Sequence, residues 1–243
     1  MAHQSRCSEH PHVDADRDLA EAPTVTQLAS VRGVIFDLWD TLVDWPHEAM
    51  HDLNTQIAAH IGIDLPELHV RLRSTYRISQ TGPYERALRA LGVPEAHVTE
   101  HVEARFAFTR TVLNPRPGVL ETLAALRARG IRTGLISMCS EDVVVAWPGT
   151  AMAELLDTAT FSATTGLVKP EPEIYLATAA ALGLTPYECL FVGDGANNEL
   201  AGAEATGMTA VLIAPADTDP QWLEVRDWQG QRVTTIPEVL ELC

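Results

Sequence analysis

Polar residues suited to catalysis stand at the end of a short apolar segment near the start of the sequence. The stretch VIFDLWDTLVDW, residues 34–45, runs from an apolar strand into Asp37, with a second acid at Asp40 and a hydroxyl at Thr41. A carboxylate at the tip of a strand can attack phosphorus or carbon and form a covalent aspartyl intermediate that water later opens. Trp39, two residues after Asp37, can neither protonate a leaving group nor activate water. The stretch therefore predicts a nucleophile loop that lacks a general acid at this position.

Three further predicted strands lead into polar residues with chemical potential. Two strands end at Ser137 and Asp194, and Lys169 lies in the loop after a third. Lys169 is the single lysine among 17 basic residues, and its compact ammonium differs from the planar fork of arginine. Because ligands of parallel α/β sheets bind at the carboxyl ends of the strands, we expect these residues to converge with Asp37.

The elements that would position these residues follow from the spacing of apolar side chains. Residues 31–38 predict a buried strand, and residues 47–113 show only helical periodicity, as three or four helices with breaks at Gly62, 65–67, 81–83 and 91–95. After residue 114 strands and helices alternate: strands 131–137, 158–163, 188–194 and 208–214, helices 118–129, 171–183 and 196–206, and a loop and short helix up to about residue 156. This alternation predicts an α/β fold with a doubly wound parallel sheet.

The same pattern predicts how the chain is divided. We expect a disordered tail over residues 1–30, an α/β core formed by residues 31–45 and 114–243, and an inserted all-α cap over residues 46–113. Trp45-Pro46 and residues 114–118 are hinge candidates between the two parts.

Composition restricts the partners of the protein. The formal net charge of −16 argues against nucleic acid, which needs basic patches. No run approaches the roughly 18 apolar residues of a membrane span, and residues 1–30 lack the apolar segment of a secretory signal. The four cysteines are far apart and are expected to be reduced thiols. We therefore expect a cytoplasmic monomer or homodimer that acts on a small molecule.

Four motifs resemble those of the haloacid dehalogenase superfamily of aspartate-nucleophile hydrolases and stand in the family's order: Asp37 with Thr41, Ser137, Lys169-Pro170, and GDGANNE at 193–199. The resemblance covers roughly residues 31–214, and the helical segment stands where many members carry a cap. It implies that Asp37 is the nucleophile and that Thr41 positions its loop. It also implies that Ser137 binds a transferring oxygen and that Lys169 neutralises charge on the nucleophile and the phosphoryl group.

The resemblance further implies a Mg²⁺ ion held by Asp37, Asp194 and the backbone carbonyl of Trp39. Hard oxygen ligands of this kind suit Mg²⁺. Glu199 stands where the family often has aspartate, and Asn198 precedes it; both are expected to support the metal from its surroundings. An alternative interpretation of Glu199 is an acid that favours the dipole of the following helix.

Trp39 departs from the pattern of the superfamily's phosphatases, which carry a second aspartate there. Asp40 occupies the next position, commonly glycine, and is expected to point differently. Loss of a general acid costs about 10²–10⁴ in rate. That loss is tolerable when the leaving group is stable as an anion, as is halide or the carboxylate of an acyl phosphate.

Two other branches of the superfamily also lack the second aspartate. The haloacid dehalogenases carry an aromatic residue at the position of Trp39 and a tyrosine at that of Tyr175, but they use no metal and replace the acid at Asp194. They usually have asparagine where this sequence has Met138, which would line the substrate side of the site. Phosphonoacetaldehyde hydrolase uses a cap lysine and is excluded, because residues 47–113 contain none.

The helical segment is expected to supply specificity. Arg73 and Arg77 are spaced i,i+4 and are candidates to bind a substrate carboxylate or phosphate, with a solvated helix face as the alternative. Trp45 is a candidate wall of an apolar pocket, with core packing as its alternative. Three histidines of the segment show no spacing that predicts a metal site: His47, His51 and His60.

These observations predict a capped hydrolase with Asp37 as nucleophile, most simply a Mg²⁺-dependent phosphatase of a small phosphorylated metabolite. The first alternative is metal-free hydrolysis of the carbon–halogen bond of a 2-haloacid. The second is a catalytically silent binding or regulatory member of the same fold.

Overall fold

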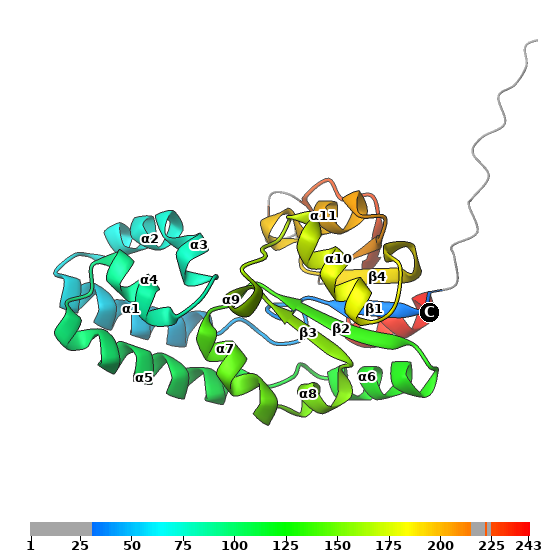
Figure 1. Cartoon of the computed structure of the whole chain (residues 1–243), viewed down its shortest axis with the longest axis horizontal. Coiled ribbons are helices and arrows are strands. Elements are labelled where there is room, and N and C mark those ends of the chain that lie inside the picture. The colour runs from blue at the N-terminus through cyan, green and yellow to red at the C-terminus, as the bar shows by residue number, and fades with distance from the viewer. Residues whose placement is uncertain (1–30, 215–221, 223–224) are drawn as a thin grey trace, which may run out of the picture.

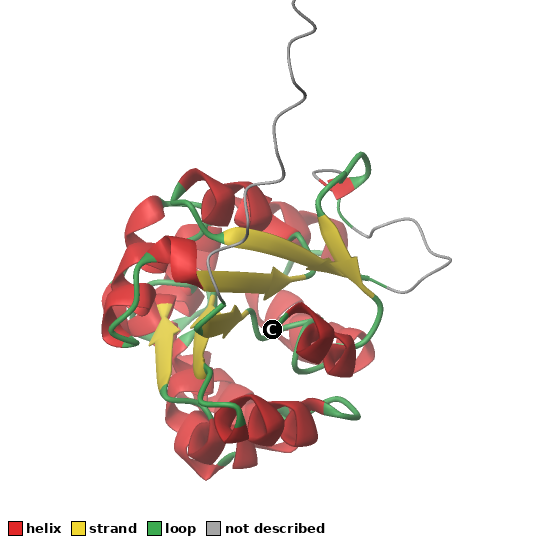
Figure 2. Cartoon of the chain, turned by 90° about the vertical axis from the view of Figure 1, so that its right-hand side faces the viewer, coloured by secondary structure: helices red, strands yellow, loops and turns green. Residues whose placement is uncertain are grey.

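A six-stranded sheet forms the centre of the computed structural model, which describes residues 31–214, 222 and 225–243. All of its strand pairs are parallel, in the order β3-β2-β1-β4-β5-β6. The strands are β1 (Gly33–Phe36), β2 (Arg132–Ser137), β3 (Thr158–Phe161), β4 (Cys189–Gly193), β5 (Thr209–Ile213) and β6 (Gln231–Val233). Helices cover both faces of the sheet (Figure 1 and Figure 2). The predicted doubly wound α/β fold is confirmed, and the predicted N-terminal tail lies outside the described residues.

Two apolar clusters hold the helices against the two faces of the sheet. Successive side chains of a strand point to opposite faces, and β1 shows this directly. Val34 and Phe36 pack with helix α6 (Val119–Ala128) and the 3₁₀ helix η5 (Ile236–Leu242). Ile35 packs on the other side with α10 (Pro172–Ala181) and α11 (Glu199–Ala205). The continuous apolar run of β1 follows from burial on both faces.

Five helical segments stand between β1 and β2: α1 (His47–Ile61), α2 (Leu65–Ser74), α3 (Tyr76–Ser79), α4 (Tyr84–Leu91) and α5 (Glu95–Val112). They enclose an apolar cluster of their own, which includes Ile57, Leu68, Leu88 and Val98. The prediction of three or four helices with a break at 65–67 is wrong in detail. That stretch opens α2, because the Asp64 side chain accepts a hydrogen bond from the Glu67 backbone N–H and caps the helix.

Several predicted boundaries shift by a few residues. The strand predicted over 158–163 ends at Phe161, since Ser162 already begins α9 (Ser162–Thr165). The helix predicted over 196–206 starts only at Glu199, because Asn197 and Asn198 have left-handed φ angles of 56° and 54° in the turn η3 (Ala196–Asn198). Between β2 and β3 the chain forms α7 (Glu141–Ala146), η1 (Trp147–Gly149) and α8 (Ala151–Leu155). The turn η2 (Pro186–Glu188) precedes β4, and the short elements β6 and η5 were not predicted.

Across the part of the chain that the structure describes, no helix combines the length and apolar character needed to cross a membrane. Cys139, Cys189 and Cys243 form no disulfide among the described residues. Cys7 lies outside the described residues.

Candidate active site

The predicted reactive residues meet at the carboxyl edge of the sheet because β1 lies between β2 and β4. Asp37 follows β1 directly, and its backbone N–H donates to the carbonyl of Val192 in β4 at 2.9 Å. Ser137 is the last residue of β2, and Asp194 follows the last residue of β4. The two flanking strands thus place their terminal residues on either side of Asp37.

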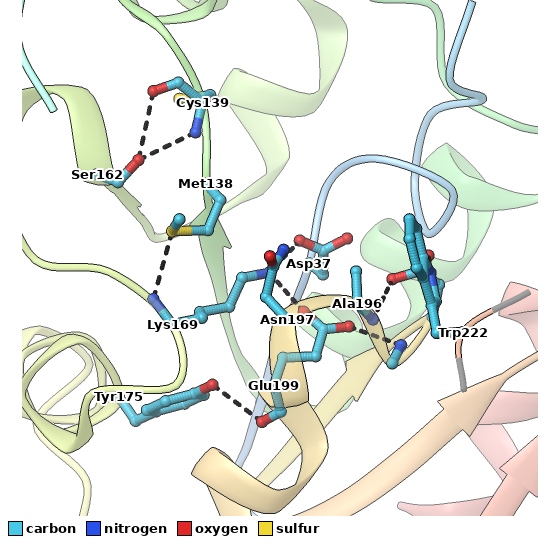
Figure 3. A network of polar contacts seen from close by, with 12 residues as sticks. Asp37, Met138, Cys139, Ser162, Lys169, Tyr175, Ala196, Asn197, Glu199 and Trp222 are labelled. Carbon is cyan, nitrogen blue, oxygen red and sulfur yellow. Dashed lines mark hydrogen bonds and ion pairs between the residues drawn. The ribbon is translucent and has the colours of Figure 1, made fainter. Parts of the chain in front are cut away.

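Lys169 reaches into this edge from the loop before α10. Its Nζ lies 2.5 Å from Oδ1 of Asp37 and also pairs with the carboxylate of Glu199 (Figure 3). The three residues are buried, with exposed fractions of 5%, 5% and 0% for Lys169, Asp37 and Glu199. Burial by itself would lower the pKa of Lys169, but the two carboxylates raise it above its usual value. Lys169 is therefore a buried ammonium that binds the predicted nucleophile.

The carboxylate of Glu199 points into the site rather than along the dipole of its own helix. Its Oε1 accepts a hydrogen bond from the Gly195 backbone N–H at 2.9 Å, and its backbone carbonyl accepts one from the Tyr175 hydroxyl at 2.9 Å (Figure 3). Gly193 leaves room for it, since a Cβ there would lie 2.1 Å from Oε1. The geometry favours the interpretation of Glu199 as part of the polar cluster.

Asp37, Asp194 and Glu199 form an acidic cluster, in which one carboxylate oxygen from each lies within 4.8 Å of the others. Three carboxylates and the Lys169 ammonium carry −3 + 1 = −2 charges when all are ionised. Burial raises the pKa of both Glu199 and Asp194, and the neighbouring Asp37 raises that of Asp194 further. A divalent cation would offset this charge, so the residues fit the oxygen-ligated Mg²⁺ that the family implies.

Two buried hydroxyls in the site are without protein partners. The Oγ of Ser137 and the Oγ1 of Thr41 make no hydrogen bond to the described residues. An unsatisfied buried hydroxyl costs free energy, and most buried polar atoms are paired. An oxygen-rich ligand at the end of β2 would satisfy Ser137, which fits the predicted contact with a transferring oxygen.

Asp40 is held by its own loop. Its φ of +55° lies in the left-handed region, which explains why glycine is common there and why aspartate is tolerated. Its Oδ1 accepts a hydrogen bond from the Trp45 backbone N–H at 3.0 Å. Trp39 packs edge-to-face on the ring of Trp45, with ring centroids 4.9 Å apart. In the structure the Asp40 carboxylate therefore contacts the turn of its own loop. It does not take the place of the general acid that is missing at Trp39.

The loop after β2 is tied to the rest of the site by contacts that the sequence did not predict. The Met138 sulfur lies 3.3 Å from the Lys169 backbone nitrogen, and the Ser162 hydroxyl accepts a hydrogen bond from the Cys139 N–H at 3.0 Å (Figure 3). The Trp222 indole N–H donates to Oδ2 of Asp194. Ser162 lies inside the strand predicted over 158–163, so the sequence indicated neither its contact nor that of Trp222.

The two predicted arginines do not share one continuous helix face. Arg73 is exposed on α2, which ends at Ser74, while Arg77 lies on α3 and pairs with Glu171 at 2.7 Å. A closer link between the inserted helices and the site is the Asn197 side chain, whose amide lies 3.4 Å from the Tyr76 hydroxyl. Asn198 occupies the N-cap position of α11, but its side chain makes no capping hydrogen bond to the helix.

The fold and the buried aspartate–lysine pair define a class of α/β hydrolases that work at the carboxyl edge of a parallel sheet. The model of the haloacid dehalogenase-like hydrolases matches residues 31–206, so the chain belongs to this family and is a hydrolase.

Relatives and solved structures agree with this assignment. The chain is 28% identical over 203 residues to a glyceraldehyde 3-phosphate phosphatase of Methanopyrus kandleri, covering 75% of this chain and 84% of that protein. A HAD phosphatase structure from Thermococcus onnurineus superposes with a TM-score of 0.66 at 21% identity, covering 87% of this chain and 97% of the other. An L-2-haloacid dehalogenase structure from Xanthobacter autotrophicus gives 0.59 at 19% identity, with coverages of 87% and 98%. At these identities the two structures show the shared fold alone.

Proposed function

We propose that this hydrolase is a Mg²⁺-dependent phosphatase of a small phosphorylated metabolite, with Asp37 as its nucleophile. The observation that carries the proposal is the acidic cluster of Asp37, Asp194 and Glu199 around the buried Lys169 ammonium. A site for a phosphate dianion needs cationic charge beside its carboxylate nucleophile, because like charges otherwise repel. Lys169 and a divalent ion would together supply that charge.

In this mechanism an Asp37 oxygen attacks phosphorus, the bond from phosphorus to the leaving group breaks, and an aspartyl phosphate forms. Water then cleaves that intermediate to release phosphate and regenerate the carboxylate. Lys169 holds Asp37 in place and offsets charge on the phosphoryl group, while the unpaired hydroxyl of Ser137 donates to one of its oxygens. A Mg²⁺ ion held by Asp37, Asp194 and the Trp39 carbonyl would supply further charge neutralisation.

The leaving group is restricted by the loop that follows Asp37. Trp39 offers no transferable proton, and the Asp40 carboxylate accepts a hydrogen bond from the Trp45 backbone. The expected substrates therefore release a group that is stable as an anion, such as the carboxylate of an acyl phosphate. The name of the Methanopyrus kandleri relative, a glyceraldehyde 3-phosphate phosphatase, supports a phosphorylated substrate but not this leaving group, because glyceraldehyde 3-phosphate is an alkyl phosphate.

Hydrolysis of a 2-haloacid is the second candidate function. Trp39 favours it, because halide leaves without a proton. The acidic cluster opposes it, because a metal-free displacement has no use for two further carboxylates beside the nucleophile.

A substrate panel separates the two candidates. We expect acetyl phosphate and p-nitrophenyl phosphate to be hydrolysed in Mg²⁺ and to be spared in EDTA, with glycerol 3-phosphate much slower and 2-chloropropionate untouched. Release of chloride at equal rates with and without Mg²⁺, together with inert phosphates, would overturn the phosphatase proposal.

The covalent step is tested by trapping the aspartyl phosphate with borohydride during turnover, and the bond that water attacks is tested by single turnover in heavy-oxygen water. Because water attacks the phosphorus of the intermediate, mass spectrometry is expected to find the label in the released phosphate, whereas the carbon ester formed from a 2-haloacid would be opened at its carbonyl carbon and would label Asp37. Asp37→Asn should abolish turnover, whereas Asp40→Asn keeps an oxygen that can accept from Trp45. The loss in Asp40→Asn should be smaller than the roughly 10²–10⁴ of a missing general acid. Label in the Asp37 side chain, or no trapped Asp37 adduct while product accumulates, would contradict the mechanism.

A further inference from the structure

Three histidines and one glutamate meet at the end of the inserted helices that lies away from the sheet (Figure 1). His60 is the penultimate residue of α1, while His97, Glu100 and His101 lie in the first turns of α5. The rings of His60 and His97 stack with centroids 3.7 Å apart, and Nδ1 of His97 lies 3.3 Å from Oε2 of Glu100. The sequence spacing around His60 predicted no metal site. The residues that contact His60 in the structure belong to α5, which begins 35 residues further along the chain.

The donor atoms of this histidine cluster match those of a transition-metal site. One ligand atom each from His60, His97 and Glu100 lies within 4.8 Å of the other two. Two imidazole nitrogens and a carboxylate oxygen form a common ligand set of zinc sites that keep one open position. Imidazole also suits copper and nickel, whereas Mg²⁺ prefers oxygen alone. The donor set therefore differs in kind from that of the acidic cluster at Asp37.

His101 is the fourth residue of the histidine cluster and contacts the ring of His60. It is buried, and its Nε2 lies 2.8 Å from Nδ1 of His60. This hydrogen bond occupies Nδ1 of His60, while its Nε2 makes no hydrogen bond to the described residues. Partners of this type orient metal-binding histidines and select the nitrogen that binds.

We propose that His60, His97 and Glu100 bind a divalent transition-metal ion of the zinc class, with His101 as the residue that positions His60. Each imidazole must bind in its ring plane, so the stacked rings rotate on binding. The half-exposed positions of His60 and His97 leave them room to do so. The ion would join the C-terminal end of α1 to the N-terminal end of α5 and so brace the helical insertion independently of the reaction at Asp37.

The test is a zinc titration of the full chain followed by calorimetry, after the metal has been stripped with a chelator. In every variant, asparagine replaces three histidines near the N-terminus that would bind zinc independently of the cluster: His3, His10 and His12. We expect one equivalent of zinc per chain, unaffected by an excess of Mg²⁺, and a rise in melting temperature on binding.

Single substitutions then identify the ligands. His97→Gln and Glu100→Gln alter exposed or half-exposed positions, so folding should be retained, and each should weaken zinc binding at least tenfold. His101→Gln should weaken it by about 10–100-fold without removing a ligand, as loss of an orienting partner does.

Two matched controls complete the experiment. His51→Gln and His69→Gln change exposed histidines of α1 and α2 outside the cluster and should leave the affinity unchanged. Asp37→Asn should likewise leave zinc binding intact, which separates this site from the acidic cluster. Unchanged affinity in His97→Gln, equal losses in the two control variants, or no binding by the parent chain would overturn the proposal.

Discussion

Trp39 packs edge-to-face on Trp45, and the Asp40 side chain accepts a hydrogen bond from the Trp45 backbone N–H, so both side chains make their contacts within the loop that follows Asp37. The left-handed φ of Asp40 turns its carboxylate toward that contact. Under the proposed mechanism, the choice of leaving group depends on whether a proton donor stands two residues after Asp37. We therefore expect the residue at position 39 to separate substrates that need protonation from those that do not.

Trp39→Asp should extend the substrate range toward simple alkyl phosphates. The new carboxyl group stands where the phosphatases of the superfamily carry their acid, so kcat/KM for glycerol 3-phosphate relative to acetyl phosphate should rise by about 10²-fold or more. Trp39→Phe is the matched control, since it also removes the indole but adds no acid, and it should leave this ratio unchanged. An unaltered ratio in Trp39→Asp would show that the leaving group is not limited by this position.

At the scale of elements, a buried ion pair joins the inserted helix α5 to α7 of the α/β part. Nε of Arg105 lies 2.8 Å from Oδ2 of Asp142, and their side chains are 9% and 0% exposed. Asp142 also accepts hydrogen bonds from the hydroxyls of Thr109 and Ser140. Because Asp142 lies five residues after Ser137, the insertion is anchored beside the loop that we propose contacts substrate.

Breaking this pair from one side should destabilise the protein strongly. Arg105→Met or Asp142→Asn leaves a buried charge or polar group without its partner, and each should lower the free energy of unfolding by about 3–5 kcal/mol. The double variant should lose less than the sum, because the second change removes the unpaired group. Urea denaturation measures the free energy of unfolding of the two single variants and of the double variant. The exposed pair Arg89–Glu95, 2.7 Å apart, is the control, and its disruption should leave stability unchanged. Losses of less than 1 kcal/mol at Arg105 and Asp142 would contradict this account.

At the scale of the whole molecule, the charge of −16 and the acidic cluster both favour binding of a cation. We expect Mg²⁺ to bind the folded chain only, since Asp37 follows β1 whereas Asp194 and Glu199 follow β4. At a Mg²⁺ concentration 100 times its Kd the folded state should gain about 2.7 kcal/mol, or roughly 5–10 °C in Tm for a chain of this size.

Asp194→Asn should remove this stabilisation, because it withdraws one carboxylate from the cluster. Glu103→Gln, at an exposed position of α5, should retain it. Thermal melts in Mg²⁺ and in EDTA make the comparison. Equal melting temperatures of the parent chain in both would show that the cluster binds no magnesium.

The sequence by itself determined the parallel α/β fold and the meeting of Asp37, Ser137, Lys169 and Asp194. These predictions succeed because they depend on local signals. Apolar runs mark the strands, alternation with helices makes the strands parallel, and parallel strands bring their carboxyl ends to one edge.

Only the tertiary structure decided where several side chains point. The Asp40 carboxylate turns to Trp45, Glu199 turns to Lys169, and Trp222 reaches Asp194. The sequence also did not reveal that Arg73 and Arg77 lie on different helices, or that the rings of His60 and His97 stack. The physical reason is common to all of them. A left-handed backbone angle or a contact between distant segments sets the direction of a side chain, and neither leaves a periodic trace in the order of residues.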